Sequence, residues 1–301
     1  MNLKGMFQQK SLGIQFALFL AITFISGIIF SVISYVLLPS LFNVSFFSLQ
    51  SFLSDYSNQE AVNALKFLQL FSSIGLFIIS PLLFSYLTYF HLNLNWQLNR
   101  RTILLGIVIM FLLNPLILFL YQWNQELVLP DIFLTIEQWM KATEEKAMKL
   151  TEAFLRMENF NDLLINLLLI AIIPAIGEEL LFRGVLQKFF FKWTGKIHWA
   201  IFVSAFLFSS IHLQFYGFLP RFILGLVLGY MFYWSGSLWI PILAHFTNNA
   251  LAILFHYHLL ADKIKLDFIN NEIPVNINQA FFSFFAAGIL LYLLKKSIIK
   301  S

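Results

Sequence analysis

The sequence contains no cysteine, and this absence excludes three kinds of chemistry. No disulfide can form, no thiolate can bind a metal, and no cysteine can serve as a nucleophile. Any metal would have to be bound by histidine, carboxylate or amide groups. Candidate functional residues are therefore sought among those side chains.

Charged residues are also scarce. They make up 11 % of the 301 residues, whereas 59 % are hydrophobic and the mean hydropathy is +0.80. A water-soluble domain carries roughly 25 % charged residues, so most of this exterior must face membrane lipid. The net charge is only +4, and no basic stripe with interleaved aromatic residues is present. Nucleic-acid binding is therefore not predicted.

Eight apolar runs approach the ~20 residues that a helix needs to cross a bilayer. They cover residues 12–38, 65–90, 102–123, 161–192, 198–213, 219–235, 238–259 and 278–295. The fourth is too long for one straight crossing, and its Pro174 and Gly177 predict a kink or break. The predicted fold class is all-α: a polytopic transmembrane helical bundle of about eight spans, forming one integral membrane domain over residues 1–301.

Basic residues gather at the run ends that fall on one side of this bundle. They are Lys4, Lys10, Arg100, Arg101, Lys188, Lys192, Lys196, Lys295 and Lys296. The loop at 39–64, on the other side, contains no Lys or Arg. The positive-inside rule therefore predicts that both termini are cytoplasmic. The membrane is expected to be a bacterial inner membrane. Arg221, on the predicted outer side, is the exception.

The long polar stretch at 126–158 separates the third and fourth runs. Within it, residues 135–158 have helical spacing of apolar and charged positions, which predicts an amphipathic surface helix. A lid that gates substrate access is the less favoured interpretation.

Ionisable residues inside apolar runs are informative, because a charge at mid-bilayer costs about 2.5–3.5 kcal/mol on insertion scales. Glu178 and Glu179 are adjacent in the fourth run. On a helix, Glu179 and Arg183 are four residues apart and can pair on one face. Glu178 is left without that partner, as a proton-accepting group would be. The alternative is an ion cluster that only fixes helix packing.

Histidine and asparagine mark two further runs. His212 ends the fifth, and His245 and Asn249 share one helical face of the seventh. A packed or interfacial histidine is the alternative for each, and His256 and His258 are interpreted as interfacial. With the carboxylate of the fourth run, these side chains can activate a water and stabilise an oxyanion. No H-E-x-x-H is present, so a thermolysin-like zinc site is not indicated.

The order and spacing of these residues resemble a known family. The three motifs are Glu178-Glu179-x-x-x-Arg183, Phe208-x-x-x-His212 and His245-x-x-x-Asn249. They are similar to those of the CPBP family, which groups type II CAAX prenyl endopeptidases with bacteriocin-processing and bacteriocin-immunity membrane proteins. The resemblance covers a core of about residues 160–260.

The resemblance implies an all-α membrane fold with catalytic residues in a cavity open to the cytoplasmic side. Glu178 would be the general base that activates water, assisted by His212, and His245 with Asn249 would bind the developing oxyanion. The second glutamate and its arginine would support them. The family is labelled a metalloprotease, although a metal-independent glutamate mechanism has also been argued for it. If a divalent metal such as zinc is used, its ligands would be Glu178, His212 and His245.

If each run crosses the bilayer as one straight helix, the residues of this site lie at different depths. Such spanning places Glu178 near the middle or cytoplasmic end of its run, and His212 near the far end of the next. The two could then meet only if the run boundaries shift, or if a break in the fourth run changes the depth of Glu178.

The favoured function is an intramembrane endopeptidase that hydrolyses a peptide bond in a membrane-associated protein or peptide, using water activated by glutamate and histidine. A non-enzymatic bacteriocin-immunity or interaction protein is the first alternative. A proton-coupled transporter is the second, because intramembrane Glu, His and Arg can also form a proton relay. Against it, the two halves show no repeat and no paired broken helices. The sequence does not identify the substrate.

Overall fold

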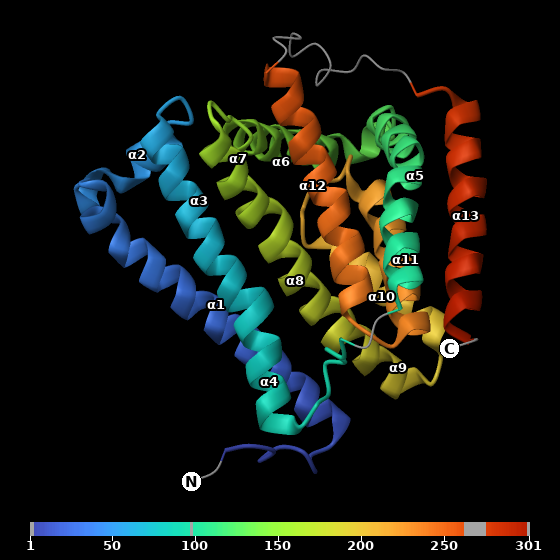
Figure 1. Cartoon of the computed structure of the whole chain (residues 1–301). Helices are drawn as coiled ribbons and strands as arrows, with labels where there is room; N and C mark the ends of the chain where they lie inside the picture. The colour runs from blue at the N-terminus through green and yellow to red at the C-terminus, as the bar shows by residue number, and fades with distance from the viewer. Residues whose placement is uncertain (1–2, 97–98, 262–274, 300–301) are drawn as a thin grey trace.

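The structure is a computed structural model that describes residues 3–96, 99–261 and 275–299. It is 82 % helical and contains no strand within these ranges. The predicted all-α class is therefore confirmed. Figure 1 shows the helices as a bundle in which most axes run between two ends of the molecule.

The helices follow one another along the chain as α1 (Leu12–Phe42), η1 (Phe46–Ser48), α2 (Leu49–Ser54), α3 (Gln59–Ser73), η2 (Ile74–Ile79), α4 (Ser80–Thr88), α5 (Arg100–Gln125), η3 (Asp131–Phe133), α6 (Leu134–Phe154), α7 (Phe160–Asn166), η4 (Leu167–Ile172), α8 (Ile173–Glu179), η5 (Leu180–Gln187), α9 (Lys188–Thr194), α10 (Ile197–Ser210), α11 (Phe218–Ser235), α12 (Trp239–Ala261) and α13 (Ile277–Ile299). Segments η2, η4 and η5 are π-helical. They join their neighbours into the continuous helices Gln59–Thr88 and Phe160–Thr194.

All eight predicted runs are helices, but not all are alike. Within the described ranges, six are long and apolar enough to cross a membrane: Leu12–Phe42, Gln59–Thr88, Arg100–Gln125, Phe160–Thr194, Phe218–Ser235 and Ile277–Ile298. Helix α10 has only 14 residues, about 21 Å at 1.5 Å per residue, which is shorter than the ~30 Å hydrocarbon core. Helix α12 is long enough, but its His and Asn residues lower its hydropathy. Length and composition thus support six spans rather than about eight.

Helix ends lie where the sequence provides suitable caps. Asn159 begins the long fourth helix: its side chain accepts from the backbone N–H groups of Asn161 and Asp162, and the Asp162 carboxylate accepts from the Asn159 N–H in return. This reciprocal capping satisfies N–H groups that have no partner inside the helix. Helices α9 and α11 end at Gly195 and Gly236, whose φ values of 67° and 65° favour glycine.

The helices form two groups on either side of the continuous helix that contains α8. In Figure 1, α1 and the α3–α4 helix lean together on one side, and α5, α11, α12 and α13 stand on the other. Helix α6 lies across one end of the bundle, whereas the start of α1, helix α9 and the end of α13 lie at the opposite end. The predicted surface helix at 135–158 is thus α6, which ends at Phe154.

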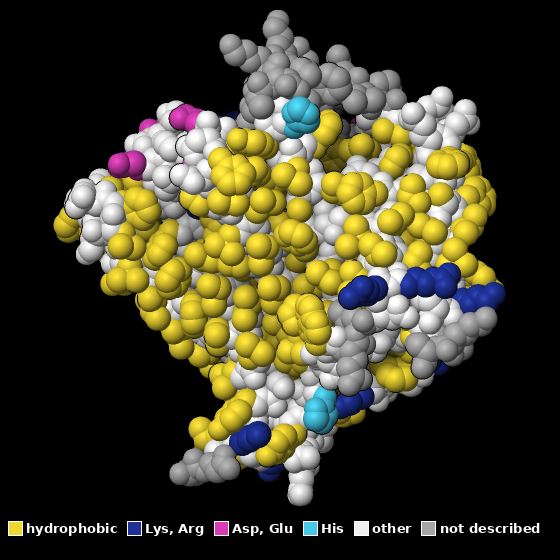
Figure 2. Space-filling view, in the orientation of Figure 1, with side chains coloured by type: hydrophobic (Ala, Val, Ile, Leu, Met, Phe, Trp, Pro, Cys, Tyr) yellow, Lys and Arg dark blue, Asp and Glu magenta, His cyan; other side chains and the backbone are white. Residues whose placement is uncertain are grey.

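Acidic and basic side chains lie toward opposite ends of the bundle. Figure 2 shows a broad band of hydrophobic side chains on this face, with Asp and Glu toward the end that carries α2 and Lys and Arg in the opposite half. Exposed apolar side chains such as Phe24, Phe282 and Tyr292 lie on helices of this band. The chain is therefore an integral membrane protein. The orientation, with both termini cytoplasmic, stays a prediction.

The predicted kink or break in the fourth run is instead a pair of π segments in an unbroken helix. Pro174 has no N–H to donate to the carbonyl of Ile170. Asn249 of α12 donates Nδ2 to that carbonyl at 3.2 Å. Gly177 lets the helix pack closely against η2, since a Cβ there would lie 2.7 Å from Cβ of Phe77. Short π segments of this kind occur often at functional sites.

Candidate active site

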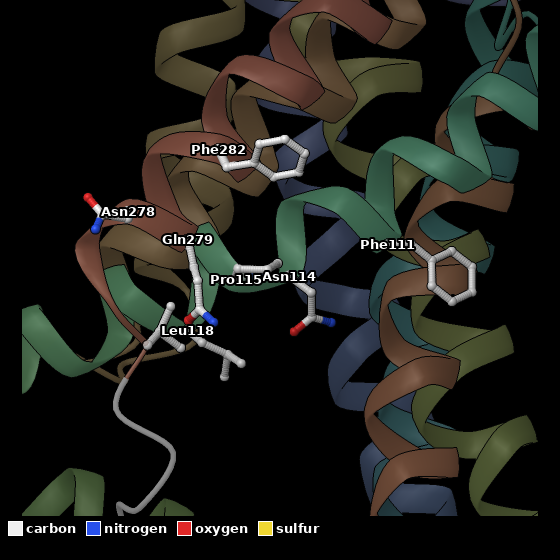
Figure 3. A pocket seen from close by; sticks show the side chains of 8 residues that line it. Phe111, Asn114, Pro115, Leu118, Asn278, Gln279 and Phe282 are labelled. Carbon is white, nitrogen blue, oxygen red and sulfur yellow. The ribbon is translucent and has the colours of Figure 1, made fainter.

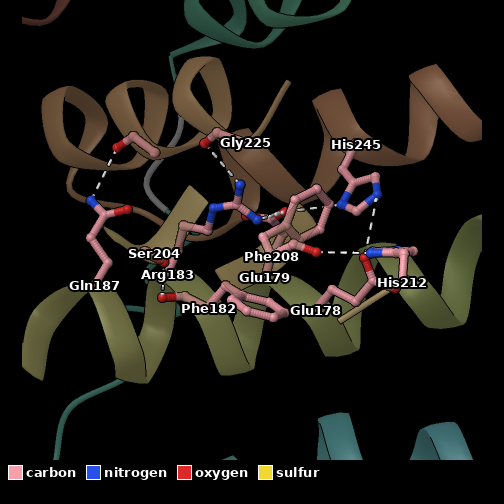
Figure 4. A network of polar contacts seen from close by, with 11 residues as sticks. Glu178, Glu179, Phe182, Arg183, Gln187, Ser204, Phe208, His212, Gly225 and His245 are labelled. Carbon is pink, nitrogen blue, oxygen red and sulfur yellow. Dashed lines mark hydrogen bonds and ion pairs between the residues drawn. The ribbon is translucent and has the colours of Figure 1, made fainter. Parts of the chain in front are cut away.

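Side chains from three parts of the chain meet inside the bundle. Glu178 lies on α8, His212 lies just after α10, and His245 lies on α12. Figure 4 shows these three side chains pointing toward one another. The difficulty over depth is resolved by the shortness of α10. Because this helix ends partway across the bundle, His212 reaches the level of Glu178 instead of the far surface.

Glu179 and Arg183 form the buried ion pair that their spacing predicted. Nη1 of Arg183 donates to Oε1 of Glu179 at 2.6 Å, and the two side chains are 1 % and 0 % exposed. Nη2 donates to the carbonyl of Gly225 on α11 at 2.9 Å. The guanidinium also lies over the ring of Phe208, 4.8 Å from its centroid. These contacts tie α8, α10 and α11 together around one arginine.

His245 connects the two adjacent glutamates. Its Nδ1 lies 2.9 Å from Oε1 of Glu179, and its Nε2 lies 3.8 Å from Oε2 of Glu178. Because an ionised carboxylate only accepts hydrogen bonds, Nδ1 must carry a proton. In the neutral ring, Nε2 then presents its lone pair toward Glu178. Glu179 thus orients His245 as well as pairing with Arg183.

His212 is oriented in a similar way. Its Nδ1 donates to the carbonyl of Phe208 at 2.8 Å, which leaves Nε2 for the site. The Phe208 ring packs edge-on against both imidazoles, with centroid distances of 5.3 Å to His212 and 5.8 Å to His245. One aromatic side chain therefore spaces the two histidines and covers the arginine beneath them.

Asn249 has hydrogen-bond partners of its own on α12 and η4. Its Nδ2 donates to Ile170 and its Oδ1 accepts from Asn248 at 3.2 Å. The amide therefore supports the helix at the π segment η4. Its role as an oxyanion donor stays a prediction, for which its second N–H is the relevant group.

The turn that carries His212 is held by residues that sequence reasoning did not select. Nδ2 of Asn124, at the end of α5, donates to the carbonyls of Phe215 and Tyr216 at 2.7 Å each. Glu144 of α6 accepts from the Tyr216 N–H at 3.4 Å. Both side chains are buried, although each lies in a polar stretch that looks solvated in sequence. Helix α6 therefore contacts the turn that carries His212.

Glu178, His212 and His245 are the side chains that would bind a metal. Both histidines have Nδ1 engaged and Nε2 toward the site, as metal-binding histidines do. However, within the ranges that the structure describes, no group of three or more His, Asp or Glu side chains is placed to hold one ion. The arrangement therefore does not fit a zinc site of Glu178, His212 and His245, and we derive no step through a metal.

A cavity of about 540 Å³ lies elsewhere, between α5 and α13. Figure 3 shows the amides of Asn114, Asn278 and Gln279 at this cavity, with Phe111 and Phe282 beside them. None of its lining residues comes from α8, α10 or α12. It is therefore separate from the glutamate and histidine cluster.

The segment that contains Glu178, His212 and His245 is similar to known proteins. Residues 160–251 match the family model described as type II CAAX prenyl endopeptidase Rce1-like. The chain is also 30 % identical over 90 residues to the "Uncharacterized protein YpbD" of Bacillus subtilis (strain 168), an alignment that covers 29 % of this chain and 43 % of that protein. The match thus spans less than half of the relative's length. No solved structure matches the chain. The resemblance expected from the three motifs is confirmed for the segment that contains them.

Proposed function

We propose that this chain, with its segment similar to the CAAX prenyl endopeptidases, is an intramembrane endopeptidase that hydrolyses a peptide bond in a membrane-associated protein or peptide. The observation that carries the proposal is the convergence of Glu178, His212 and His245 inside a membrane bundle. Such a convergence of a carboxylate and two oriented imidazoles is expected of a hydrolytic site. The family match supports the same class of reaction.

Glu178 is assigned as the general base. The 3.8 Å between its Oε2 and Nε2 of His245 is too long for a direct hydrogen bond and short enough for one water to bridge. Glu178 takes a proton from this water, and the resulting hydroxide attacks the carbonyl carbon of the peptide bond. When the C–N bond breaks, Glu178 returns the proton to the leaving amine. The products are one new carboxyl terminus and one new amino terminus.

His212 helps to hold the water, and His245 stabilises the oxyanion. The water has two protons: Glu178 takes one, and the other is donated in a hydrogen bond to Nε2 of His212 in the neutral tautomer assigned above. We assign His245 to the imidazolium form throughout the reaction, with Nδ1–H bonded to the Glu179 carboxylate at 2.9 Å and Nε2–H free to donate to the oxyanion. We assign oxyanion stabilisation to His245 in this form, together with the second amide N–H of Asn249. The mechanism proceeds without a metal.

The test compares membrane and secreted peptides from cells that carry the wild-type protein or Glu178→Gln. The variant keeps the size of the side chain but cannot accept the proton, so specific peptide products should disappear while the protein still inserts. Glu60→Gln, the same change at an exposed position, is the matched control and should leave the products unchanged. An identical peptide pattern with wild type and Glu178→Gln would refute the proposal.

Two other assays distinguish the endopeptidase from the alternative functions. A bacteriocin-immunity or interaction protein would still protect against its toxin after loss of Glu178 and His245. A proton-coupled transporter would show flux in liposomes that contain the purified protein. Neither behaviour is expected of an endopeptidase.

A further inference from the structure

Arg221 is a cation held in a defined position beside the turn that carries His212. It lies in the first turn of α11 and is partly buried. Its Nη2 donates to Oε1 of Gln214, and its Nη1 donates to the Gln214 carbonyl at 3.4 Å. The guanidinium packs against Gly217, where a Cβ would contact Nη1. The side chain is thus folded back onto the turn that precedes α11.

This cation is not neutralised by contact with a carboxylate. Within the part of the chain that the structure describes, no Asp or Glu oxygen lies within 4.0 Å of the Arg221 guanidinium. Arg183, in contrast, binds Glu179 at 2.6 Å. Both partners of Arg221 are neutral oxygens of Gln214, so its positive charge and further N–H donors are available. An arginine whose only hydrogen-bond partners are neutral can bind an anionic partner.

Arg221 is also close to the reacting groups. It lies nine residues after His212 in the sequence, on the other side of the same turn. Its charge lies within electrostatic reach of Glu178, His212 and Glu144. The N-terminal end of α11 adds further positive potential at this position. The guanidinium and the helix end thus place positive potential near Glu178.

A cavity lies beside the turn, on its α6 side, although Arg221 itself does not line it. It measures about 540 Å³, and Tyr216 of the turn and Gln125 of α5 line it together with one face of α6. Glu144 is part of that face and is the carboxylate of α6 within electrostatic reach of Arg221. A peptide that lay in this cavity would pass between α6 and the turn that carries His212.

We propose that Arg221 binds a carboxylate of the peptide substrate and thereby positions the peptide at Glu178. The inference rests on the proposed endopeptidase function, since the anionic groups of an unmodified peptide are carboxylates. The planar guanidinium matches a carboxylate with two parallel hydrogen bonds. The carboxylate can be the C-terminus of the peptide or an Asp or Glu side chain, and the experiment distinguishes the two.

The test measures peptide binding by fluorescence anisotropy, with the full-length chain in phosphatidylcholine nanodiscs. The probes are fluorescein-labelled Phe-Leu-Phe-Leu with a free C-terminal carboxylate, the same peptide with a C-terminal amide, and two amidated peptides that end in Glu or Gln. One carboxylate peptide should bind about tenfold more tightly than its neutral match. Preference for the free terminus assigns the C-terminal carboxylate, and preference for Glu over Gln assigns a side chain.

Substitutions of Arg221 show whether this residue causes the preference for a carboxylate peptide. Arg221→Gln should abolish it, and Arg221→Lys should reduce it to about threefold because an ammonium lacks the bidentate geometry. Lys149→Gln is the matched control: it removes a cation of α6 that lines the neighbouring cavity and is already paired with Glu145 at 2.7 Å, and it should leave the preference intact. If Arg221→Gln fails to insert, Arg221→Lys alone decides the question, since an unchanged preference would then overturn the proposal.

Two further outcomes would overturn it: no preference in the wild type, or an undiminished preference in Arg221→Gln. Because binding is measured without cleavage, the result is independent of the Glu178→Gln comparison. Peptide products that persist in Glu178→Gln would refute the endopeptidase while the carboxylate preference could still stand. A missing preference with normal processing would refute only the role of Arg221.

Discussion

Replacing Arg183 with methionine tests whether the ion pair beneath the active site stabilises the bundle. Arg183→Met keeps much of the apolar stem and removes the bond to Glu179 at 2.6 Å, the bond to Gly225 at 2.9 Å and the contact with Phe208. Glu179, which is fully buried, would keep only the hydrogen bond from His245. Removing one partner of a buried pair leaves an uncompensated charge and costs about 3–5 kcal/mol. We expect a loss of unfolding free energy of that size.

A double variant shows whether the loss of unfolding free energy comes from the unpaired charge of Glu179. Arg183→Met combined with Glu179→Gln removes both charges, so the double variant should recover most of the stability that Arg183→Met loses. Unfolding by denaturant in detergent, followed through tryptophan fluorescence, measures both. A single-variant loss below about 1 kcal/mol, or a double variant as unstable as the sum of the singles, would refute the reasoning.

Three further outcomes are expected. Peptide processing should persist in EDTA, because the site does not arrange three metal-binding side chains within the described ranges; loss of products that zinc restores would contradict this. Burial raises the pKa of Glu144 above its usual value, so the folded state holds the proton more tightly and its stability falls as pH rises through that value. Glu144→Gln should therefore be more stable than wild type near pH ~7 and not below pH ~4, as thermal unfolding in detergent would show, and a constant difference would count against this explanation. Gly177→Val should separate α8 from η2, because a Cβ would lie 2.7 Å from Cβ of Phe77, and should lower the yield of folded protein where Gly13→Val, at an open position, does not.

Much of the architecture was predictable because lipid imposes a simple rule on composition. Backbone groups in a bilayer must bond within their own segment, so long apolar runs form helices. Every predicted run is helical, and the ion pair of Glu179 and Arg183 follows from their spacing alone. The spanning lengths were less predictable. Hydropathy did not show where α10 begins and ends, and the 14 residues of this helix make it too short to cross the bilayer.

The candidate site was likewise predictable only in part. Motif spacing selected Glu178, His212 and His245, and the structure brings their side chains together. Spacing could not show that Asn249 binds the Ile170 carbonyl, since that depends on a proline in another helix. Nor could it select Glu144, whose neighbours in sequence are charged and exposed, although it is buried against the turn that follows α10.

The sequence by itself determined that this chain is a helical membrane protein with a few costly polar residues, because composition and periodicity are local properties that lipid selects directly. Only the tertiary structure decided the level at which those residues meet, the orientation of each imidazole and the partners of each arginine. Arg221 illustrates the difference most clearly. In the sequence it was an exception to a charge pattern, and in the fold it lies beside the turn that carries His212, where no carboxylate of the described residues contacts it. Contacts between distant segments determine such features, and no local pattern encodes them.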